Sequence, residues 1–138
     1  MVITRKVEFS ASHMCRRPEL SEEENSRIYG PAANPHGHGH NYVLEVSLEG
    51  DPDPVTGMVL DLKELKDILN RQIVDTYDHR FLNYEVAPFD QVIPTPENIA
   101  IDIWSRLEPR FRSVRARLHG VRVYETPDLF VDYFGGAA

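Results

Sequence analysis

The sequence is poor in cysteine and has no long apolar run. Its only cysteine, Cys15, cannot form a disulfide within the chain, so we expect a reducing, cytoplasmic environment. No apolar stretch approaches the roughly 20 residues that a membrane-spanning helix needs, so we expect no membrane association. Residues 1–9 include Arg5, Lys6 and Glu8, a pattern unlike a secretory signal.

Positive charge is also scarce. The chain has 15 Lys and Arg against 22 Asp and Glu, which gives a net charge of −7. This balance argues against a general nucleic-acid-binding surface, although a local basic pocket remains compatible with an anionic small substrate. Internal repeats and low-complexity tracts are lacking as well. At 138 residues, we predict a single domain over residues 1–138 with a buried core.

A group of three histidines is the most distinctive feature that the sequence does contain. His36, His38 and His40 alternate with glycines and lead into an alternating apolar run. Side chains two residues apart in a strand lie on the same face, so His38 and His40 should project together. Neutral imidazoles suit a borderline-soft cation such as zinc. The alternative is a chance polar turn or a surface histidine cluster, because short motifs give false positives.

His13, which lies outside this group, is the best candidate for a third metal ligand. Catalytic zinc sites commonly use three protein ligands and leave one position open. His13 has the same parity as Val7 and Phe9, so it should leave the first strand on the apolar face. His36 has suitable parity too, but it precedes the strand. We therefore predict His13, His38 and His40 as ligands of Zn²⁺.

The apolar pattern predicts an α+β fold. Strands are predicted at residues 2–9, 41–49, 58–60, 118–125 and 129–133. A short helix should follow Ser21, a longer one should follow Asp61, and a third should begin at the Thr95-Pro96-Glu97-Asn98 segment. We expect an antiparallel sheet covered on one face by the two longer helices, with exposed edges that oligomerisation could satisfy.

Two further groups are candidates for chemistry. A carboxylate next to an imidazole, as in Asp78-His79, can raise the imidazole pKa and prepare it for proton transfer, although a solvated loop pair is the simpler explanation. Glu125 ends a strand whose apolar positions are Val121 and Val123. It is either exposed or a buried group that binds a paired N–H edge, as guanidine-like rings present. The sequence leaves both alternatives open.

Several motifs, in order along nearly the whole chain, resemble the 6-pyruvoyl-tetrahydropterin synthase family. That family includes bacterial 6-carboxy-tetrahydropterin synthases of the queuosine pathway. The matching segments are Phe9-Ser10-Ala11-Ser12-His13, residues 20–25, residues 34–42, residues 53–58, Asp78-His79, residues 95–98 and residues 123–126.

The resemblance implies a fold and an activity. The fold is the tunnelling fold (T-fold), a four-stranded antiparallel sheet with two helices on one face. The family assembles it into homotrimers or homohexamers around a β-barrel, with active sites between subunits. The activity is that of a zinc-dependent carbon–oxygen lyase. It eliminates triphosphate from 7,8-dihydroneopterin triphosphate and gives 6-pyruvoyl-tetrahydropterin, on the route to tetrahydrobiopterin, or 6-carboxy-tetrahydropterin.

The resemblance also implies roles for individual residues. The histidines already predicted as ligands match the family's zinc ligands. Glu125 matches the acid that anchors the pterin ring, helped by the segment around Thr95 and Glu97. Asp78 and His79 match a pair that transfers protons together with a cysteine.

The position of that cysteine is occupied by Ala32, two residues after Gly30. Alanine cannot transfer a proton. The chain is an engineered variant, a natural homologue with altered or lost activity, or an enzyme in which Cys15 substitutes. We favour the first explanation because every other catalytic position is intact. A non-catalytic pterin- or zinc-binding homologue and an aldolase-like pterin enzyme on the same scaffold are the alternative functions.

Overall fold

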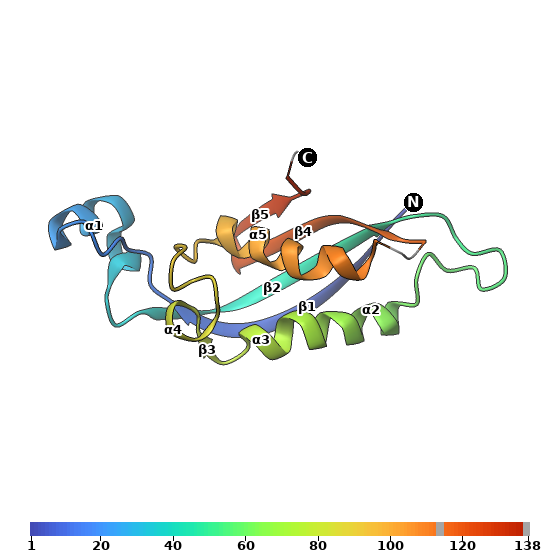
Figure 1. Cartoon of the computed structure of the whole chain (residues 1–138), viewed down its shortest axis with the longest axis horizontal. Helices are drawn as coiled ribbons and strands as arrows, with labels where there is room; N and C mark the ends of the chain where they lie inside the picture. Colours follow the sequence, from blue (N-terminus) through green and yellow to red (C-terminus); the bar gives the residue numbers. More distant parts are fainter. Residues whose placement is uncertain (113–114, 137–138) are drawn as a thin grey trace.

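The computed structural model of the chain describes residues 1–112 and 115–136. Five strands form one mixed sheet in the order β3-β1-β2-β4-β5 (Figure 1). The strands are β1 (Val2–His13), β2 (His38–Glu49), β3 (Arg80–Phe81), β4 (Arg117–Thr126) and β5 (Leu129–Tyr133). All neighbours pair antiparallel except β3, which pairs parallel with β1.

The prediction of a four-stranded, wholly antiparallel sheet is therefore wrong in one respect. The additional strand, β3, is only two residues long and pairs with Ala11 and Ser12. Two residues cannot display an alternating pattern, so the sequence gives no signal for this strand.

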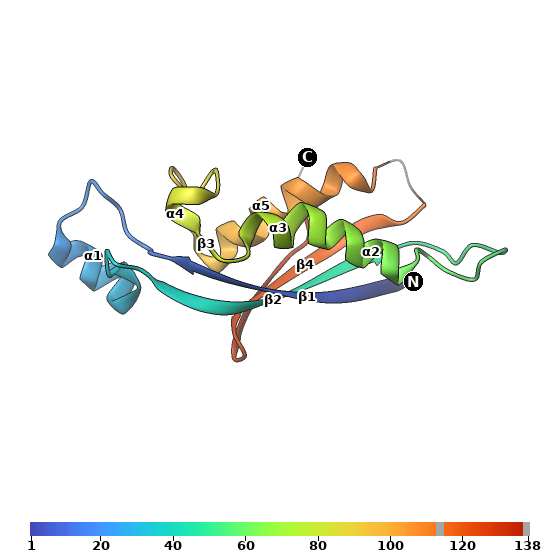
Figure 2. The same cartoon turned by 90° about the horizontal axis from the view of Figure 1, so that it is seen from below.

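The helical segments lie mainly on one face of the sheet. They are α1 (Glu22–Tyr29), the 3₁₀ turn η1 (Gly30–Ala33), α2 (Leu62–Leu69), the π-helical turn η2 (Asn70–Val74), α3 (Asp75–Tyr77), α4 (Leu82–Glu85), α5 (Pro96–Leu107) and the 3₁₀ turn η3 (Glu108–Arg110). Figure 2 shows α2, α3 and α5 on the same side of the long strands, whereas α1 lies beyond one end of the sheet. The predicted two-helix layer is thus present.

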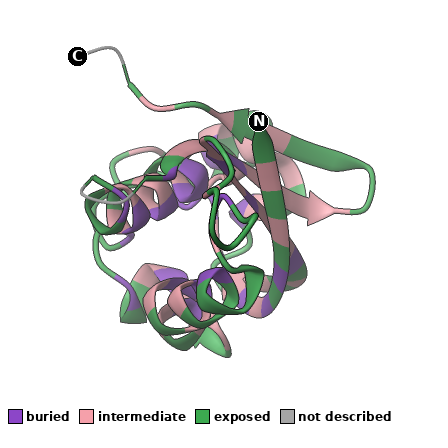
Figure 3. Cartoon of the chain, turned by 90° about the vertical axis from the view of Figure 1, so that its right-hand side faces the viewer, coloured by how far each residue is buried: buried purple, intermediate pink, exposed green. Residues whose placement is uncertain are grey.

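The core lies between these helices and the sheet, where the buried residues gather in Figure 3. The inward positions of β2 are fully buried, as period-2 alternation requires: Tyr42, Leu44, Val46 and Leu48. The helices oppose them with residues at helical spacing, which are Leu65, Leu69, Ile73, Ile99, Ile103 and Leu107. The start of β2, which carries the histidines, is therefore fixed by a packed strand.

The predicted helix starts are confirmed. Ser21 and Glu24 form a capping box at α1. The side chains of Asp61 and Thr95 each accept a hydrogen bond from a backbone N–H in the first turn of α2 and α5, respectively. Since Thr95 directly follows Pro94, this cap fixes the backbone beside the candidate site described below.

The segment after β2 differs from its prediction. Residues 58–60 form no strand, and the backbone N–H of Asp53 instead donates to the Met58 carbonyl at 2.9 Å within a loop. The helix that follows Asp61 is longer than its first segment, because α2 continues through η2 into α3. Leu62, predicted on the buried stripe, is 43% exposed.

Of the helices within the described residues, none combines the length and the apolar character needed to cross a membrane.

Candidate metal centre

The pairing of β1 with β2 places histidines from the two strands next to each other. His13, the last residue of β1, lies opposite His38, the first residue of β2, and Ala11 lies opposite His40. All three imidazoles are on the inward face, where His13 is fully buried. The register therefore brings together the three residues predicted as metal ligands.

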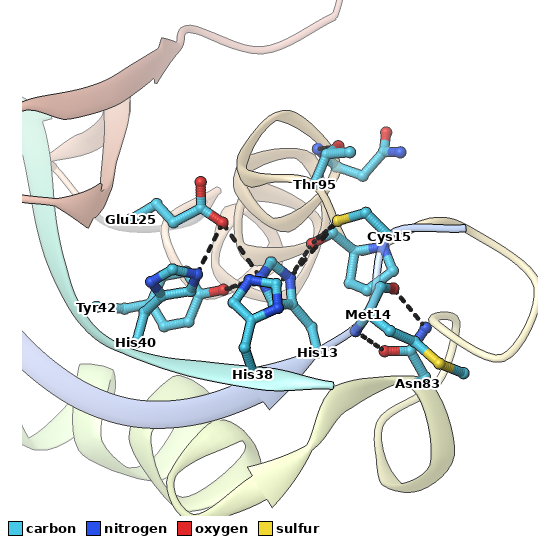
Figure 4. Close-up of polar contacts among 11 residues, drawn as sticks. His13, Met14, Cys15, His38, His40, Tyr42, Asn83, Thr95 and Glu125 are labelled. Carbon is cyan, nitrogen blue, oxygen red and sulfur yellow. Dashed lines mark hydrogen bonds and ion pairs between the residues drawn. The ribbon is translucent and has the colours of Figure 1, made fainter. Parts of the chain in front are cut away.

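Glu125 joins this group from β4 (Figure 4). It follows Val123 on the inward face, and its Oε1 lies 3.2 Å from Nε2 of His13 and 3.3 Å from Nε2 of His40. One ligand atom from each of His13, His38, His40 and Glu125 lies within 4.8 Å of all the others. Three strands thus contribute to a single four-residue cluster.

Three of the distances between these atoms have the length of an edge of a coordination tetrahedron. Zinc bonds of about 2.0–2.1 Å imply ligand–ligand distances of about 3.3–3.4 Å in a regular tetrahedron. Nε2 of His13 lies 3.1 Å from Nε2 of His38, and the two distances to Glu125 are 3.2 and 3.3 Å. These three edges match a small four-coordinate ion.

The hydrogen bonding of the histidines also fits a cation. Within the described residues, Nε2 of His40 and Nδ1 of His38 are buried without a hydrogen-bond partner. Nδ1 of His38 is on the other side of the ring from the Nε2 that lies 3.1 Å from His13, so only the unpaired Nε2 of His40 belongs to the donor atoms of the cluster. Buried polar atoms are nearly always hydrogen-bonded, and a metal would give this nitrogen a partner. Three imidazoles and one carboxylate are a donor set that zinc accepts.

Electrostatics favours one positive charge in the cluster. Burial lowers the pKa of His38 and of His40, so both imidazoles are held neutral. Burial also opposes a charge on His13, but contacts with Cys15, Glu125 and the Pro94 carbonyl outweigh it and raise the pKa of His13 to about 10. The hydrogen bond from His13 in turn lowers the pKa of Glu125. A bound cation can take the place of this proton.

A hydrogen bond on the side of the ring that faces away from the cluster fixes the orientation of His13. Its Nδ1 lies 2.7 Å from the Pro94 carbonyl and donates to it, so that Nε2 faces the cluster, where it donates to Glu125 when protonated and would offer a lone pair to a bound cation. The Tyr42 hydroxyl lies 3.4 and 3.5 Å from the two ring nitrogens. Tyr42 shares the face of His38 and His40, so strand parity could have identified it; a backbone carbonyl such as that of Pro94 has no sequence signal.

Cys15 lies behind His13 rather than in front of the cluster. Its Sγ is 3.9 Å from Nδ1 of His13 and 4.0 Å from the Pro94 carbonyl, and the residue is 6% exposed. Its backbone N–H donates to the Ala32 carbonyl at 2.8 Å. The backbone of position 32 is thus hydrogen-bonded to that of Cys15, but the thiol is on the Nδ1 side of His13, away from the Nε2 that faces the other residues of the cluster.

A clamp that the sequence did not reveal holds the chain immediately after His13. The Asn83 side chain accepts from the Met14 N–H at 2.9 Å and donates to the Met14 carbonyl at 3.0 Å. Because both backbone groups of Met14 are fixed by one amide, α4 holds the end of β1 in place.

Asp78 and His79 form a pair away from the cluster. Nδ1 of His79 lies 2.9 Å from Oδ2 of Asp78, so the two side chains do meet. The Ser10 N–H donates to Asp78 at 2.8 Å and lowers its pKa, helped by His79. The His79 side chain is 84% exposed, and its backbone has φ +61°. His79 lines a hollow with Ser10 and Ser12, whose strand parity is opposite to that of His13, and with His40 of the cluster.

The remaining candidates lie outside the cluster. Glu97 is exposed on the first turn of α5, whereas Thr95 is partly buried at its start. Ala32 is half-buried in η1, and His36 is exposed. The structure thus brings the predicted metal ligands together with Glu125 in one group, whereas Asp78 and His79 lie outside that group and only His79 shares a hollow with one of its members, His40.

Comparison with known proteins yields consistent matches. Residues 2–136 match the family described as 6-pyruvoyl tetrahydropterin synthase. The chain is 41% identical to 6-pyruvoyl tetrahydrobiopterin synthase of Homo sapiens over 133 residues, which cover 96% of this chain and 90% of that protein. It is 29% identical to 6-carboxy-5,6,7,8-tetrahydropterin synthase of Rickettsia conorii over 145 residues, with coverage of 94% and 96%. The solved structure of 6-pyruvoyl tetrahydropterin synthase from Caenorhabditis elegans superposes with a TM-score of 0.90 at 38% identity, with coverage of 99% and 96%.

Proposed function

Because the chain belongs to the 6-pyruvoyl tetrahydropterin synthase family, we propose that it is a zinc-dependent pterin lyase scaffold acting on 7,8-dihydroneopterin triphosphate. The observation that carries this proposal is the cluster of His13, His38, His40 and Glu125, whose donor atoms lie within 4.8 Å of one another and include three pairs at 3.1–3.3 Å. The whole chain, residues 1–138, would work as one cytoplasmic domain.

The three histidines would hold the metal. Their Nε2 atoms converge, and the bond from Nδ1 of His13 to Pro94 keeps the remaining lone pair of that ring directed inward. A zinc ion bound there would supply Lewis acidity, which makes the protons beside the hydroxyl groups of the substrate side chain easier to remove.

Glu125 would recognise the pterin ring. Its pKa is lowered by the hydrogen bond from His13, so it is an acceptor at neutral pH and suits the N–H edge of a guanidine-like ring. Thr95 and Glu97 at the start of α5 would be the neighbouring ring contacts. Elimination of triphosphate would give the 6-pyruvoyl product, since identity is 41% to the pyruvoyl relative and 29% to the carboxy relative.

A homo-oligomer, a trimer or hexamer built around a β-barrel, would complete the active site. His79 lines a hollow with Ser10 and Ser12 of the β1 face opposite to His13 and also with His40, but its Nδ1 pairs with Asp78 and not with a residue of the cluster. Within the described residues, positions 2–8 of β1 pair with β2 on one side only, and β5 is the other edge of the sheet. Such edges favour strand pairing with a second copy, which would supply the Asp78–His79 pair from a neighbouring subunit.

A second candidate function is non-catalytic pterin binding, and Ala32 is the observation that favours it. A methyl group cannot transfer a proton, and the Cys15 thiol is buried on the Nδ1 side of His13. The two candidates differ in whether the rest of the site can still perform the elimination once a base is present.

The test is triphosphate release from 7,8-dihydroneopterin triphosphate by the native chain, Ala32→Cys and the near-isosteric control Ala32→Ser, with the pterin product identified by mass spectrometry. A positioned acid–base group is typically worth about 10²–10⁴-fold, so we expect a gain of that order for Ala32→Cys and a much smaller one for Ala32→Ser. If the metal-loaded Ala32→Cys protein binds a pterin but releases no triphosphate, the lyase proposal fails and the non-catalytic candidate remains.

A further inference from the structure

We propose that Glu125 is the fourth ligand of the metal when no pterin is bound, and that binding of the pterin ring withdraws it from that position. The proposal rests on the proposed function only in taking the ligand to be a pterin. The Glu125 carboxylate would bind first the metal and then the pterin ring. A coordination position on the metal would therefore become free only when the ring is bound.

The first support is the contact between Glu125 and two histidines. Oε1 alone lies near both Nε2 of His13 and Nε2 of His40, at 3.2 and 3.3 Å. Ligand atoms that share a zinc ion would be about 3.3–3.4 Å apart. The carboxylate therefore occupies the corner that a catalytic zinc site would leave for water or substrate.

The second support is that these contacts are poorly explained by hydrogen bonding alone. Nε2 of His40 is buried and forms no hydrogen bond, although the Glu125 oxygen is close to it. Two electron-rich atoms placed this close together without a hydrogen bond repel each other. A cation bound between them would remove this repulsion, because both atoms would then serve as its ligands.

The third support is that Glu125 cannot serve both partners at once. Recognition of a paired N–H edge uses both carboxylate oxygens side by side. With Oε1 directed at the histidines, only Oε2 would be available to a ring. Ring binding in the bidentate manner therefore requires Oε1 to leave the metal corner.

The backbone at Glu125 is suited to such a rearrangement. The pairing of β4 with β5 is irregular between Tyr124 and Thr126, so Glu125 sits at a break in the ladder. Irregularities of this kind redirect side chains and are over-represented next to active sites. The side chain is also 15% exposed, so it is not locked in the core.

Without pterin, four protein ligands would therefore fill the coordination sphere of the metal. A pterin ring that takes the carboxylate would open one coordination position next to its own side chain. Small molecules without the ring edge would face a filled coordination sphere. Glu125 would thus contribute to specificity as well as to ring binding.

Metal affinity gives the first test. Co²⁺ binding is measured by titration of the metal-free native protein, Glu125→Gln and the control Glu64→Gln, an exposed residue on the first turn of α2. Loss of an anionic ligand should weaken Co²⁺ binding by at least the roughly 10–100-fold seen when a group that only supports a ligand is removed. Glu64→Gln should match the native protein. Equal affinity of Glu125→Gln and native protein would overturn the ligand assignment.

The visible spectrum of the Co²⁺-loaded protein gives the second test, and the results that would overturn the proposal are measured on the native protein. The probe is pterin itself, which has the N–H edge but no side chain at C6. We expect pterin to change the Co²⁺ bands of the native protein but not those of Glu125→Gln. Pterin that binds, by fluorescence quenching, and leaves the native spectrum unchanged would overturn the proposal, as would a failure of pterin to bind. Neither result depends on triphosphate release, so the lyase proposal is tested separately.

Discussion

Bound metal should raise the thermal stability of this protein considerably. The four donor atoms come from β1, β2 and β4, so they converge only in the folded chain, and metal binding is then coupled to folding. A metal present at about 1,000 times its Kd stabilises the native state by about 4.1 kcal/mol. We therefore expect removal of zinc by a chelator to lower the Tm.

The size of the shift follows from the chain length. Unfolding entropy is about 2.1 cal/mol/K per residue, or about 0.3 kcal/mol/K for 138 residues. Dividing about 4.1 kcal/mol by that entropy gives a Tm change of about 14 °C. Differential scanning calorimetry with and without zinc, at a fixed protomer concentration because assembly also affects Tm, measures it.

Two histidine variants make the measurement specific. His38 belongs to the cluster, whereas His36 is exposed two residues earlier. His36→Ala should keep most of the zinc-dependent shift, and His38→Ala should lose most of it. A shift of native size in His38→Ala, or no shift in the native protein, would refute the assignment of this cluster as a metal site.

Two further predictions concern the surroundings of the cluster. Gly37 and Gly57 both have φ +76°, but a Cβ at Gly37 would lie 2.7 Å from Cζ of Phe81 whereas one at Gly57 meets nothing within 4 Å. In urea unfolding, Gly57→Ala should therefore lose about 1–3 kcal/mol of unfolding free energy from backbone strain alone, and Gly37→Ala should lose more. In Co²⁺ titration, only Gly37→Ala should bind the metal more weakly. Equal effects of the two substitutions would contradict a steric role of Phe81. The Ser10 N–H and His79 lower the pKa of Asp78 in the folded protein. The ionised carboxylate therefore stabilises the fold at pH values above about 3.9, the pKa of Asp in the unfolded chain. This stabilisation disappears as the pH falls through the lower pKa of the folded state. The stability difference between the native protein and Asp78→Asn in urea should accordingly be present at pH 7 and shrink towards pH 2.5; a difference that stays constant would show that the charge is not responsible.

Strand periodicity was sufficient to predict which faces carry the histidines of the cluster. Alternation alone placed His38 and His40 on one face and His13 on the apolar face of its own strand, and both placements agree with the burial of β1 and β2. The same argument gave Glu125 the parity of Val121 and Val123 but left open whether it is exposed or buried, and the structure shows it partly buried beside the histidines. Period-2 patterns are reliable here because each of these strands buries one face against helices.

Properties that depend on register or tertiary contact were not predictable. Alternation fixes the face of a side chain but not its partner across the ladder, so the pairing of His13 with His38 required the structure. The resemblance assigned Glu125 to the pterin ring, and only its position beside the histidines raises a metal-binding role. The contact between Asp78 and His79 likewise depends on a local backbone with positive φ.

The most direct test of the account is the metal content and coordination of the purified protein. Elemental analysis and zinc K-edge X-ray absorption should give one zinc per chain, with only nitrogen and oxygen neighbours at about 2.0–2.1 Å from His13, His38, His40 and Glu125. A sulfur neighbour at about 2.3 Å would instead implicate Cys15, the only cysteine of the chain. That result, or a protein that retains no zinc when zinc is supplied, would contradict the four-residue metal centre.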